Sequence, residues 1–316
     1  MNRRLFLEKT TIAGLSLTSL NSCKSGSLFE NIGINLFSLP KVLEANFERG
    51  IEMLSKMGYK EIEMYGPYSF SDEKAKKRWD SLEPLVGFNG SGFFNKNTNE
   101  ILSIMNSFGL KVPSLHTDLD TLSNGMGKLA EAANILGSSY LVLPAIPDEE
   151  RQNLDAYKRI AERFNKIGED AKNNGLKFAY HNHGYGLSVM EGKIPIHLIL
   201  DETDKNLVFF EMDLFWTTAG RMDPIELLKN NSGRYHLMHV KDMKKLVHFS
   251  GDGGTANQWT ELWGEMTTAG DGVLDLPNIL KVAKENGLKH CIVEQDIVEE
   301  PEIALQRSIN YLSSLK

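Results

Sequence analysis

The sequence predicts one (β/α)8 TIM barrel, an α/β fold, on three observations. Helix-like runs stop six times at a glycine, and each time an apolar segment follows. Glycine suits the left-handed position that ends a helix, because it has no Cβ. Short β-rich runs alternate with the helices, which is typical of parallel strands joined by helical crossovers. Most of these runs end in an acid or a histidine, at the strand ends where such barrels hold their active sites. The six glycines are Gly58, Gly109, Gly137, Gly175, Gly233 and Gly287.

Eight strands are expected in order along the chain. The first, NIGINLFS, should end near Phe37 and Ser38, and the eighth, HCIVEQD, should carry Glu294 at its end. The strands are expected at residues 31–38, 61–65, 111–116, 139–144, 176–183, 207–213, 235–242 and 290–296. Apolar residues at helical spacing predict the helices. They are expected at residues 44–58, 97–109, 124–137, 153–175, 194–204, 223–231, 274–287 and 301–315.

Two long connections are expected to form loops at the active-site rim. Residues 66–97 are polar, aromatic and glycine-bearing, and we expect a loop around a short helix there. Residues 243–272 are rich in glycine and carry Trp259 and Trp263. Long loops at this end of a barrel commonly act as lids or substrate clamps.

Composition and charge agree with one globular domain. The chain has 316 residues, of which 41% are hydrophobic and 24% charged, and about 250 residues are typical of such a barrel. The net charge of −7 argues against a nucleic-acid partner, which would require a basic surface. Two cysteines are too few for a disulfide framework. Cys291 lies in the apolar run HCIVE, so we expect a buried, unreactive thiol.

Residues 1–26 are predicted to be an export segment and tether, and residues 27–316 the barrel. Arg3 and Arg4 precede a modest apolar stretch, as in a twin-arginine signal. LNSC then ends at Cys23, which resembles a lipoprotein cleavage box, so a lipid anchor is the only expected membrane contact. The alternative is a disordered basic tail. The expected location is the periplasm, free or membrane-anchored.

Several motifs follow one another at the expected strand ends. They are SLHTDL at His116, YHNH at His181 to His183, MDLFWTTAG from Asp213, RMDPIELL, HLMHVKD from His239, AGDGVLDLPNIL, and IVEQD at Glu294. In order and spacing this pattern resembles the sugar phosphate isomerase/epimerase family of xylose-isomerase-like barrels, from about Gly33 to the end of the chain. We identify the chain on this basis as an exported, lipoprotein-type member.

The resemblance implies one divalent cation at the barrel mouth. Carried over, its ligands are His181, Asp213, His239 and Glu294. Two imidazoles and two carboxylates suit manganese, zinc or cobalt, and magnesium remains an alternative. Many relatives have a glutamate in place of His181. His183 lies two residues on, on the same side of the strand, so it could share or take over that role. Asp296 would replace Glu294 as ligand if the last strand ended later.

The resemblance also implies proton transfer next to a carbonyl. Glu294 is the first choice as base, and His181 or His183 is the second acid/base. Lys241 would stabilise an enolate oxygen, or else pair with Asp242 or Glu211.

Three further side chains are candidate substrate ligands. His116 would meet a substrate hydroxyl, or serve a structural hydrogen bond. Glu63 would bind a sugar hydroxyl, or pair with Lys60 at the surface. Trp216 would form a wall for a sugar face, or pack beneath the loops.

The expected activity is therefore that of a metal-dependent isomerase or epimerase, acting on a keto-sugar or sugar derivative through an enediolate. The same enolate could expel a leaving group, which makes a lyase or dehydratase acting on an inosose or 3-keto-glycoside the alternative. A non-catalytic sugar-binding lipoprotein is the second alternative.

Overall fold

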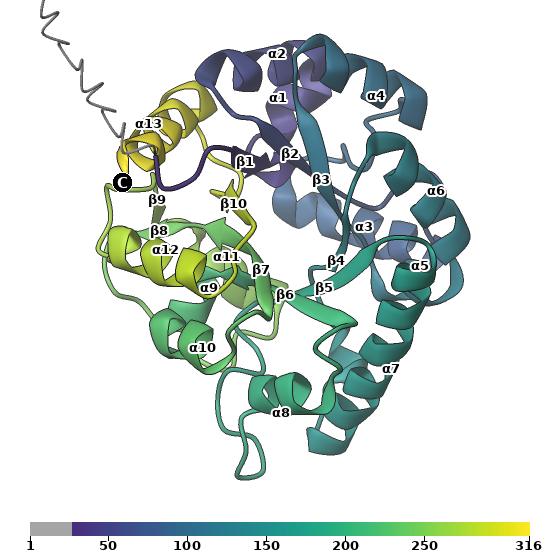
Figure 1. The fold of residues 1–316 in the computed structure, drawn as a ribbon, viewed down its shortest axis with the longest axis vertical. Coiled ribbons are helices and arrows are strands. Elements are labelled where there is room, and N and C mark those ends of the chain that lie inside the picture. Colours follow the sequence, from purple (N-terminus) through teal and green to yellow (C-terminus); the bar gives the residue numbers. More distant parts are fainter. Residues whose placement is uncertain (1–26) are drawn as a thin grey trace, which may run out of the picture.

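The computed structural model describes residues 27–316, which form a closed barrel of eight parallel strands (Figure 1). The predicted export segment lies outside the described residues. The barrel strands are β1 (Ile32–Asn35), β2 (Glu61–Tyr65), β3 (Lys111–His116), β4 (Tyr140–Leu143), β5 (Lys177–His181), β6 (Val208–Asp213), β7 (Tyr235–Val240) and β10 (His290–Val293). Each strand pairs with its neighbour in the chain, and β10 closes the barrel by pairing with both β7 and β1. The predicted fold is confirmed.

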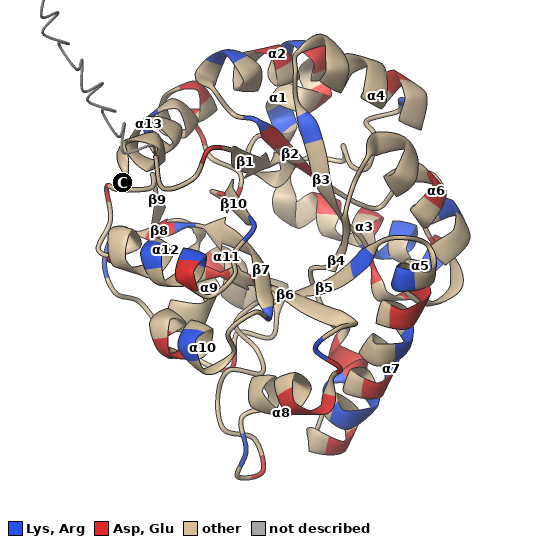
Figure 2. Cartoon of the chain, viewed as in Figure 1, with Lys and Arg blue, Asp and Glu red and all other residues tan. Residues whose placement is uncertain are grey.

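Helices cover the outside of the barrel, as the ring of ribbons in Figure 1 shows. They are α1 (Pro40–Ala45), α2 (Phe47–Met57), α4 (Thr98–Ser107), α6 (Met126–Leu136), α7 (Leu154–Asn173), α8 (Pro195–Glu202), α10 (Pro224–Asn230), α12 (Leu276–Glu285) and α13 (Pro301–Ser314). Shorter elements in the connections are η1 (Leu36–Ser38), α5 (Leu119–Asn124), η2 (Asp148–Glu150) and α9 (Leu214–Ala219). Acidic and basic residues are interspersed on the outer helices, for example on α7 (Figure 2).

The glycine stops carry the backbone conformation that the sequence predicts. All six have a positive φ, between 67° and 111°. The strand ends are less well predicted, because β1 ends three residues before Ser38. There the side chain of Asn35 accepts a hydrogen bond from the N–H of Phe37 at 2.8 Å, which starts the 3-10 turn η1.

The barrel interior is layered. Successive side chains of a strand point to opposite faces, so every second residue points inward. The inward side chains below the site are apolar and form a cluster of Tyr140, Val142, Ala179, Leu237 and Ile292. Residues two positions further along these strands include His181, His239 and Glu294. The polar site therefore lies directly above this apolar cluster in the barrel interior.

The two long connections contain more structure than expected. Residues 66–97 hold α3 (Glu73–Val86), a helix of 14 residues where a short one is predicted. Residues 243–272 hold α11 (Ala256–Trp263), and this connection is tied down by an antiparallel pair of two-residue strands, β8 (Asp242–Met243) and β9 (Met266–Thr267). No helix among the described residues has the length and apolar character needed to cross a membrane.

Candidate metal and substrate site

A cavity of about 280 Å³ opens at the C-terminal mouth of the barrel. Its floor is polar and is built by side chains from β3, β5, β7 and the segment after β10. The floor residues are His116, His181, His183, His239, Lys241, Glu294 and Asp296. The barrel thus brings together candidate residues that are up to 180 positions apart in the chain (296 − 116).

Lys241 lies at the centre of an acidic cage. Its Nζ is 3.0 Å from Asp213 Oδ2, 2.6 Å from Glu294 Oε2 and 3.0 Å from Asp296 Oδ1. Burial alone would lower the pKa of Lys241, but the three carboxylates raise it well above its usual value. The expected pairing of Lys241 with Asp242 or Glu211 is therefore wrong. Asp242 instead accepts hydrogen bonds from backbone N–H groups of the second rim connection, including that of Gly272 at 3.1 Å.

A second carboxylate layer lies beneath this cage. Glu63 and Glu211 are fully buried. The Nε2 atom of His116 is 2.8 Å from Glu211 Oε2 and 3.1 Å from Glu63 Oε2. Burial alone would lower the pKa of His116, but the two carboxylates raise it to about 9. His116 thus lies between two glutamates, and the structure supplies the structural hydrogen bond that the sequence left as an alternative.

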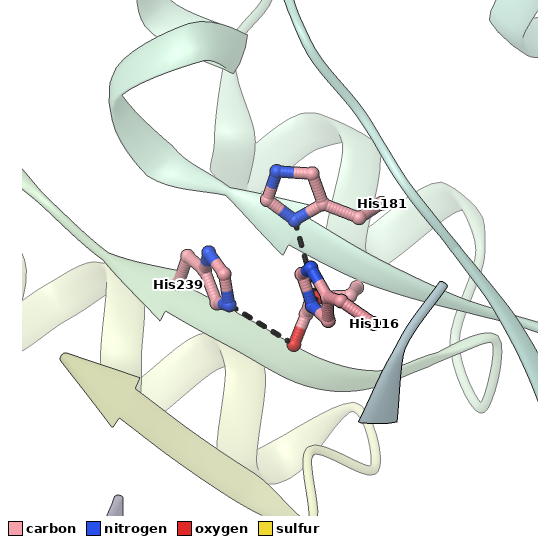
Figure 3. A group of neighbouring side chains, drawn as sticks. His116, His181 and His239 are labelled. Carbon is pink, nitrogen blue, oxygen red and sulfur yellow. Dashed lines mark hydrogen bonds and ion pairs between the residues drawn. The ribbon is translucent and has the colours of Figure 1, made fainter. Parts of the chain in front are cut away.

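His181 and His239 connect the two layers. His239 Nδ1 is 2.7 Å from Glu294 Oε2, and its Nε2 is 2.5 Å from Glu63 Oε2. His181 Nε2 is 3.9 Å from Asp213 Oδ2, and its Nδ1 is 3.2 Å from Glu211 Oε2. Figure 3 shows the imidazoles of His116, His181 and His239 turned toward one another. Each bridging ring has one nitrogen facing the upper carboxylates and the other facing a buried glutamate.

These side chains form two overlapping groups with metal-ligand geometry. In one group, ligand atoms of Asp213, His239 and Glu294 all lie within 4.8 Å of one another. The other group joins His239 to three further residues, namely His116, His181 and Glu211. Three of the four predicted ligands thus form one group, and His181 belongs to the other group, which shares His239 with the first.

Unpartnered polar atoms show that a cation fits here. His181 Nδ1, Glu211 Oε1 and Asp213 Oδ2 are buried without a hydrogen bond, although Asp213 Oδ2 faces the Lys241 ammonium at 3.0 Å. Buried polar atoms are normally satisfied, so such a cluster of exceptions calls for a ligand. Burial, more than the neighbouring groups, raises the pKa of Glu211 and brings that of Asp296 to about 7. A divalent cation would supply the positive charge that otherwise has to come from protons.

His183 lies beyond the end of β5 and has a different environment. Its ring centroid is 4.4 Å from that of Trp259 and 6.0 Å from that of Trp216. Burial, together with the charge of Lys241, lowers the pKa of His183 to about 3. Its Nδ1 has no hydrogen-bond partner. Burial thus favours the neutral form of His183, whose ring lines the cavity beside two tryptophans.

The other predicted residues have these positions. Trp216 is buried but borders the cavity, with the Lys241 ammonium 5.2 Å from its ring centroid. Glu63 is not among the residues that line the cavity, and it accepts hydrogen bonds from Ser114 and Asn35. Neither expectation for Glu63, substrate contact or pairing with Lys60, matches this position. Cys291 is buried, as predicted, and burial raises its thiol pKa to about 12.

Glu211 is the residue that the sequence reasoning missed as part of the site. It lies two positions before Asp213, so the alternation of the strand places both side chains on the inward face. The two-residue period of the strand was therefore the sequence signal that could have placed Glu211 in the site.

Residues 51–315 match the family model of the xylose isomerase-like TIM barrel. The inosose dehydratase of Clostridium perfringens (strain 13 / Type A) is 33% identical over 155 residues, which are 48% of this chain and 50% of that protein. The chain thus spans about half the length of the curated relatives that it matches first.

Two solved structures share the fold. One is described as a sugar phosphate isomerase/epimerase from Parabacteroides distasonis ATCC 8503, with a TM-score of 0.70 and 23% identity over 94% of this chain and 98% of that one. The other is an IOLI protein with a binding zinc atom, with a TM-score of 0.65 and 16% identity over 90% of this chain and 99% of that one.

Proposed function

Because the chain belongs to the xylose isomerase-like TIM barrel family, we propose that it is a divalent-metal-dependent isomerase or epimerase of a keto-sugar or sugar derivative. The observation that carries this proposal is the floor of the cavity, where two bridging imidazoles and an acidic cage face a neutral histidine. Such a site suits removal of a proton next to a carbonyl, with formation of an enediolate.

The cation would be held by the group that contains both carboxylates, together with the histidine at the end of β5. Its ligands would be His181, Asp213, His239 and Glu294. The mixed nitrogen and oxygen set suits zinc, manganese or cobalt, and also admits magnesium. The zinc atom in the IOLI relative supports a divalent metal here. When bound, the metal would polarise the substrate carbonyl and stabilise the negative charge that develops on its oxygen.

Two residues are placed to move the proton. Glu294 Oε2 is engaged by both His239 and Lys241, which lower its pKa although burial opposes them. Glu294 would act as the base on the β10 side of the cavity, and His183 as the second acid/base on the β5 side. Lys241 would stabilise the developing oxyanion.

Exchange of substrate hydrogen with solvent tests this function. The metal-loaded protein in D2O, given a panel of keto-sugars and keto-glycosides, should place deuterium next to the carbonyl of at least one of them. We expect Glu294→Gln and His183→Asn to fold and to lose exchange by about 10²–10⁴-fold. Full exchange in both variants would refute these roles. Absence of exchange for the whole panel would refute the proposed reaction.

A lyase or dehydratase is the second candidate, and the inosose dehydratase relatives favour it. The first step is the same, and His116, which lines the cavity floor, would protonate the departing oxygen. NMR of the product separates the two reactions. A new stereoisomer or ketose indicates an isomerase or epimerase, and loss of water or of an aglycone indicates a lyase.

We further propose that the chain is exported. The support is the sequence of residues 1–26, with Arg3, Arg4 and Cys23. Replacing both arginines by lysine should retain the protein inside the cell. Replacing Cys23 by alanine should release it from the membrane fraction. Unchanged fractionation of both variants would contradict the proposal.

A further inference from the structure

The cavity changes character between its floor and its opening. The floor is polar, whereas the upper walls come from α3 and α11, the helices of the two long connections. From α3 the lining residues include Ala75, Trp79, Leu82 and Val86, spaced by four, three and four positions. From α11 they are Ala256, Trp259, Thr260 and Trp263, spaced by three, one and three. Both spacings correspond to one face of a helix, so two mostly apolar faces border the opening.

Two of the three tryptophans in these walls offer their rings and not their N–H groups. The indole N–H of Trp79 donates to the carbonyl oxygen of Asn89 at 2.9 Å. The indole N–H of Trp259 donates to the carbonyl oxygen of Gly253 at 2.6 Å. Leu85 of α3 also lines the cavity, and it is 40% exposed although it is a large apolar residue. A ligand between these helices therefore meets aromatic and aliphatic surface.

The described walls are poorly suited to a phosphate group. Phosphate recognition uses arginine, lysine or free backbone N–H groups. Arg78 is the only cationic residue among the lining residues that the structure describes above the floor, and it pairs with Glu149 at 3.0 Å. Lys241, in the floor, is held by three carboxylates. With its sugar ring on the floor, a phosphate that extends toward the opening would thus meet one cationic side chain among the described lining residues, an arginine that is already paired.

We propose that this cavity binds a non-phosphorylated glycoside, with its sugar ring on the polar floor and an apolar, aryl-sized aglycone between α3 and α11. The proposal deepens the proposed function by naming the substrate class. The assignment of the sugar ring to the floor rests on that function, whereas the aglycone subsite rests on the walls themselves. A free hexose or cyclitol, with hydroxyl groups all round its ring, would leave these walls without a partner.

Burial of one phenyl ring against such walls should strengthen binding by about 10- to 100-fold. The test is calorimetric titration of the metal-loaded protein with phenyl and methyl β-D-glucopyranoside, which share a ring and differ only in the aglycone. We expect the phenyl glycoside to bind more tightly by that factor, and glucose 6-phosphate to bind more weakly than the phenyl glycoside. Equal affinities for the two glycosides, or tighter binding of the phosphate, would overturn the proposal.

Variants locate the subsite. Leu85→Asn and Trp263→Ser should each reduce the ratio of the two affinities toward one, with circular dichroism showing that the fold is kept. Val189→Asn is the matched control, since Val189 is apolar, 70% exposed and away from the cavity. It should leave the ratio unchanged. If the control lowers the ratio as much as Leu85→Asn does, the subsite is wrongly placed. Because these titrations need no turnover, a protein that prefers the phenyl glycoside but exchanges no substrate proton refutes only the proposed function.

Discussion

At the residue scale, Glu211 is the carboxylate that faces three imidazoles of the site. Its carboxylate lies near His116, His181 and His239 at 2.8, 3.2 and 3.4 Å. A carboxylate that binds one nitrogen of an imidazole fixes which nitrogen is left for a metal. The charge of Glu211 lies beside Nδ1 of His181 and Nε2 of His239, which favours an N–H at these atoms and leaves the other nitrogen of each ring facing the upper carboxylates. It acts as a positioning residue.

Glu211→Gln keeps the shape of this side chain but removes its charge. We expect the affinity for zinc to fall by about 10- to 100-fold, because the ring orientations are no longer held by a carboxylate. Competition with a chromophoric chelator measures this affinity. Glu169→Gln on the exposed side of α7 is the control and should leave it unchanged. A Glu211→Gln variant with the affinity of the wild type would show that Glu211 does not position the ligands.

Lys241 has a different task, which is to neutralise the acidic cage. Lys241→Met leaves three buried carboxylates without their cation, and removing one partner of a buried ion pair costs about 3–5 kcal/mol. We expect a loss of this size in the free energy of unfolding of the chelator-treated protein, measured with urea. Zinc should restore part of it. The exposed substitution Lys229→Met should cost less than about 0.5 kcal/mol. Equal stability of Lys241→Met and wild type in chelator would contradict this account.

At the scale of elements, the backbone of the connection at residues 243–272 passes close to the carboxylate of Asp242. Asp242 accepts hydrogen bonds from the N–H groups of Met243, Gly270, Gly272 and Leu274. A Cβ at Gly272 would lie 2.2 Å from Asp242 Oδ1. Only glycine fits there, so the connection that carries α11 is held by the residue that follows Lys241.

Gly272→Ala should therefore destabilise the protein by about 1–3 kcal/mol, because the loop and Asp242 have to move apart. Gly127→Ala on α6 is the matched control, since nothing lies within 4 Å of a Cβ there. That substitution should stabilise by about 0.5–1 kcal/mol, as alanine favours the helix. Urea denaturation of both variants gives the comparison. Similar effects of the two substitutions would mean that the contact at Gly272 does not constrain the loop.

Elements were predictable to the extent that they depend on local physics. Glycine stops, apolar helix spacing and β-rich runs all act within about a dozen residues, and these predictions are confirmed. Strand ends depend on tertiary contacts, and β10 ends at Val293 because Gln295 donates its N–H to the Ser38 hydroxyl, 257 positions away. The expectation that the strand reaches Asp296 is wrong for this reason.

At the scale of the whole molecule, the barrel brings its site together by closing. Glu63 meets His239 across 176 positions of sequence, through strands β2 and β7 that are not neighbours in the barrel. The sequence indicated which acids and histidines lie near the C-terminal ends of the strands, because the order of apolar run and polar residue is local. It could not indicate that Glu63 faces an imidazole or that Lys241 faces three acids, because these contacts follow from the register and diameter of the closed barrel.

The start of β7 carries a group that links pH to the stability of the whole fold. His236 lies against Phe209, and the Tyr140 hydroxyl donates to its Nδ1 at 3.0 Å. Burial, with Lys289 and Lys177, lowers the pKa of His236 to about 4, from about 6.5 in the unfolded chain. Between these values the unfolded chain binds more protons, so stability falls as pH falls from 6.5 toward 4.

Because His236 is partly exposed, its share of this loss between pH 7 and pH 5 should be about 1 kcal/mol. Urea denaturation at the two pH values should show a loss smaller by that amount in His236→Asn than in the wild type. Equal losses in the two proteins would exclude His236 as the linked group.

The central claim is that Asp213, His239 and Glu294 hold one divalent cation. Anomalous diffraction at the zinc edge, on crystals of the zinc-loaded protein, tests it most directly. We predict one strong peak about 2.0–2.2 Å from His239 Nδ1 and from a carboxylate oxygen of both Asp213 and Glu294. A zinc-loaded crystal with no peak at this position, or with peaks only at surface residues, would contradict the claim.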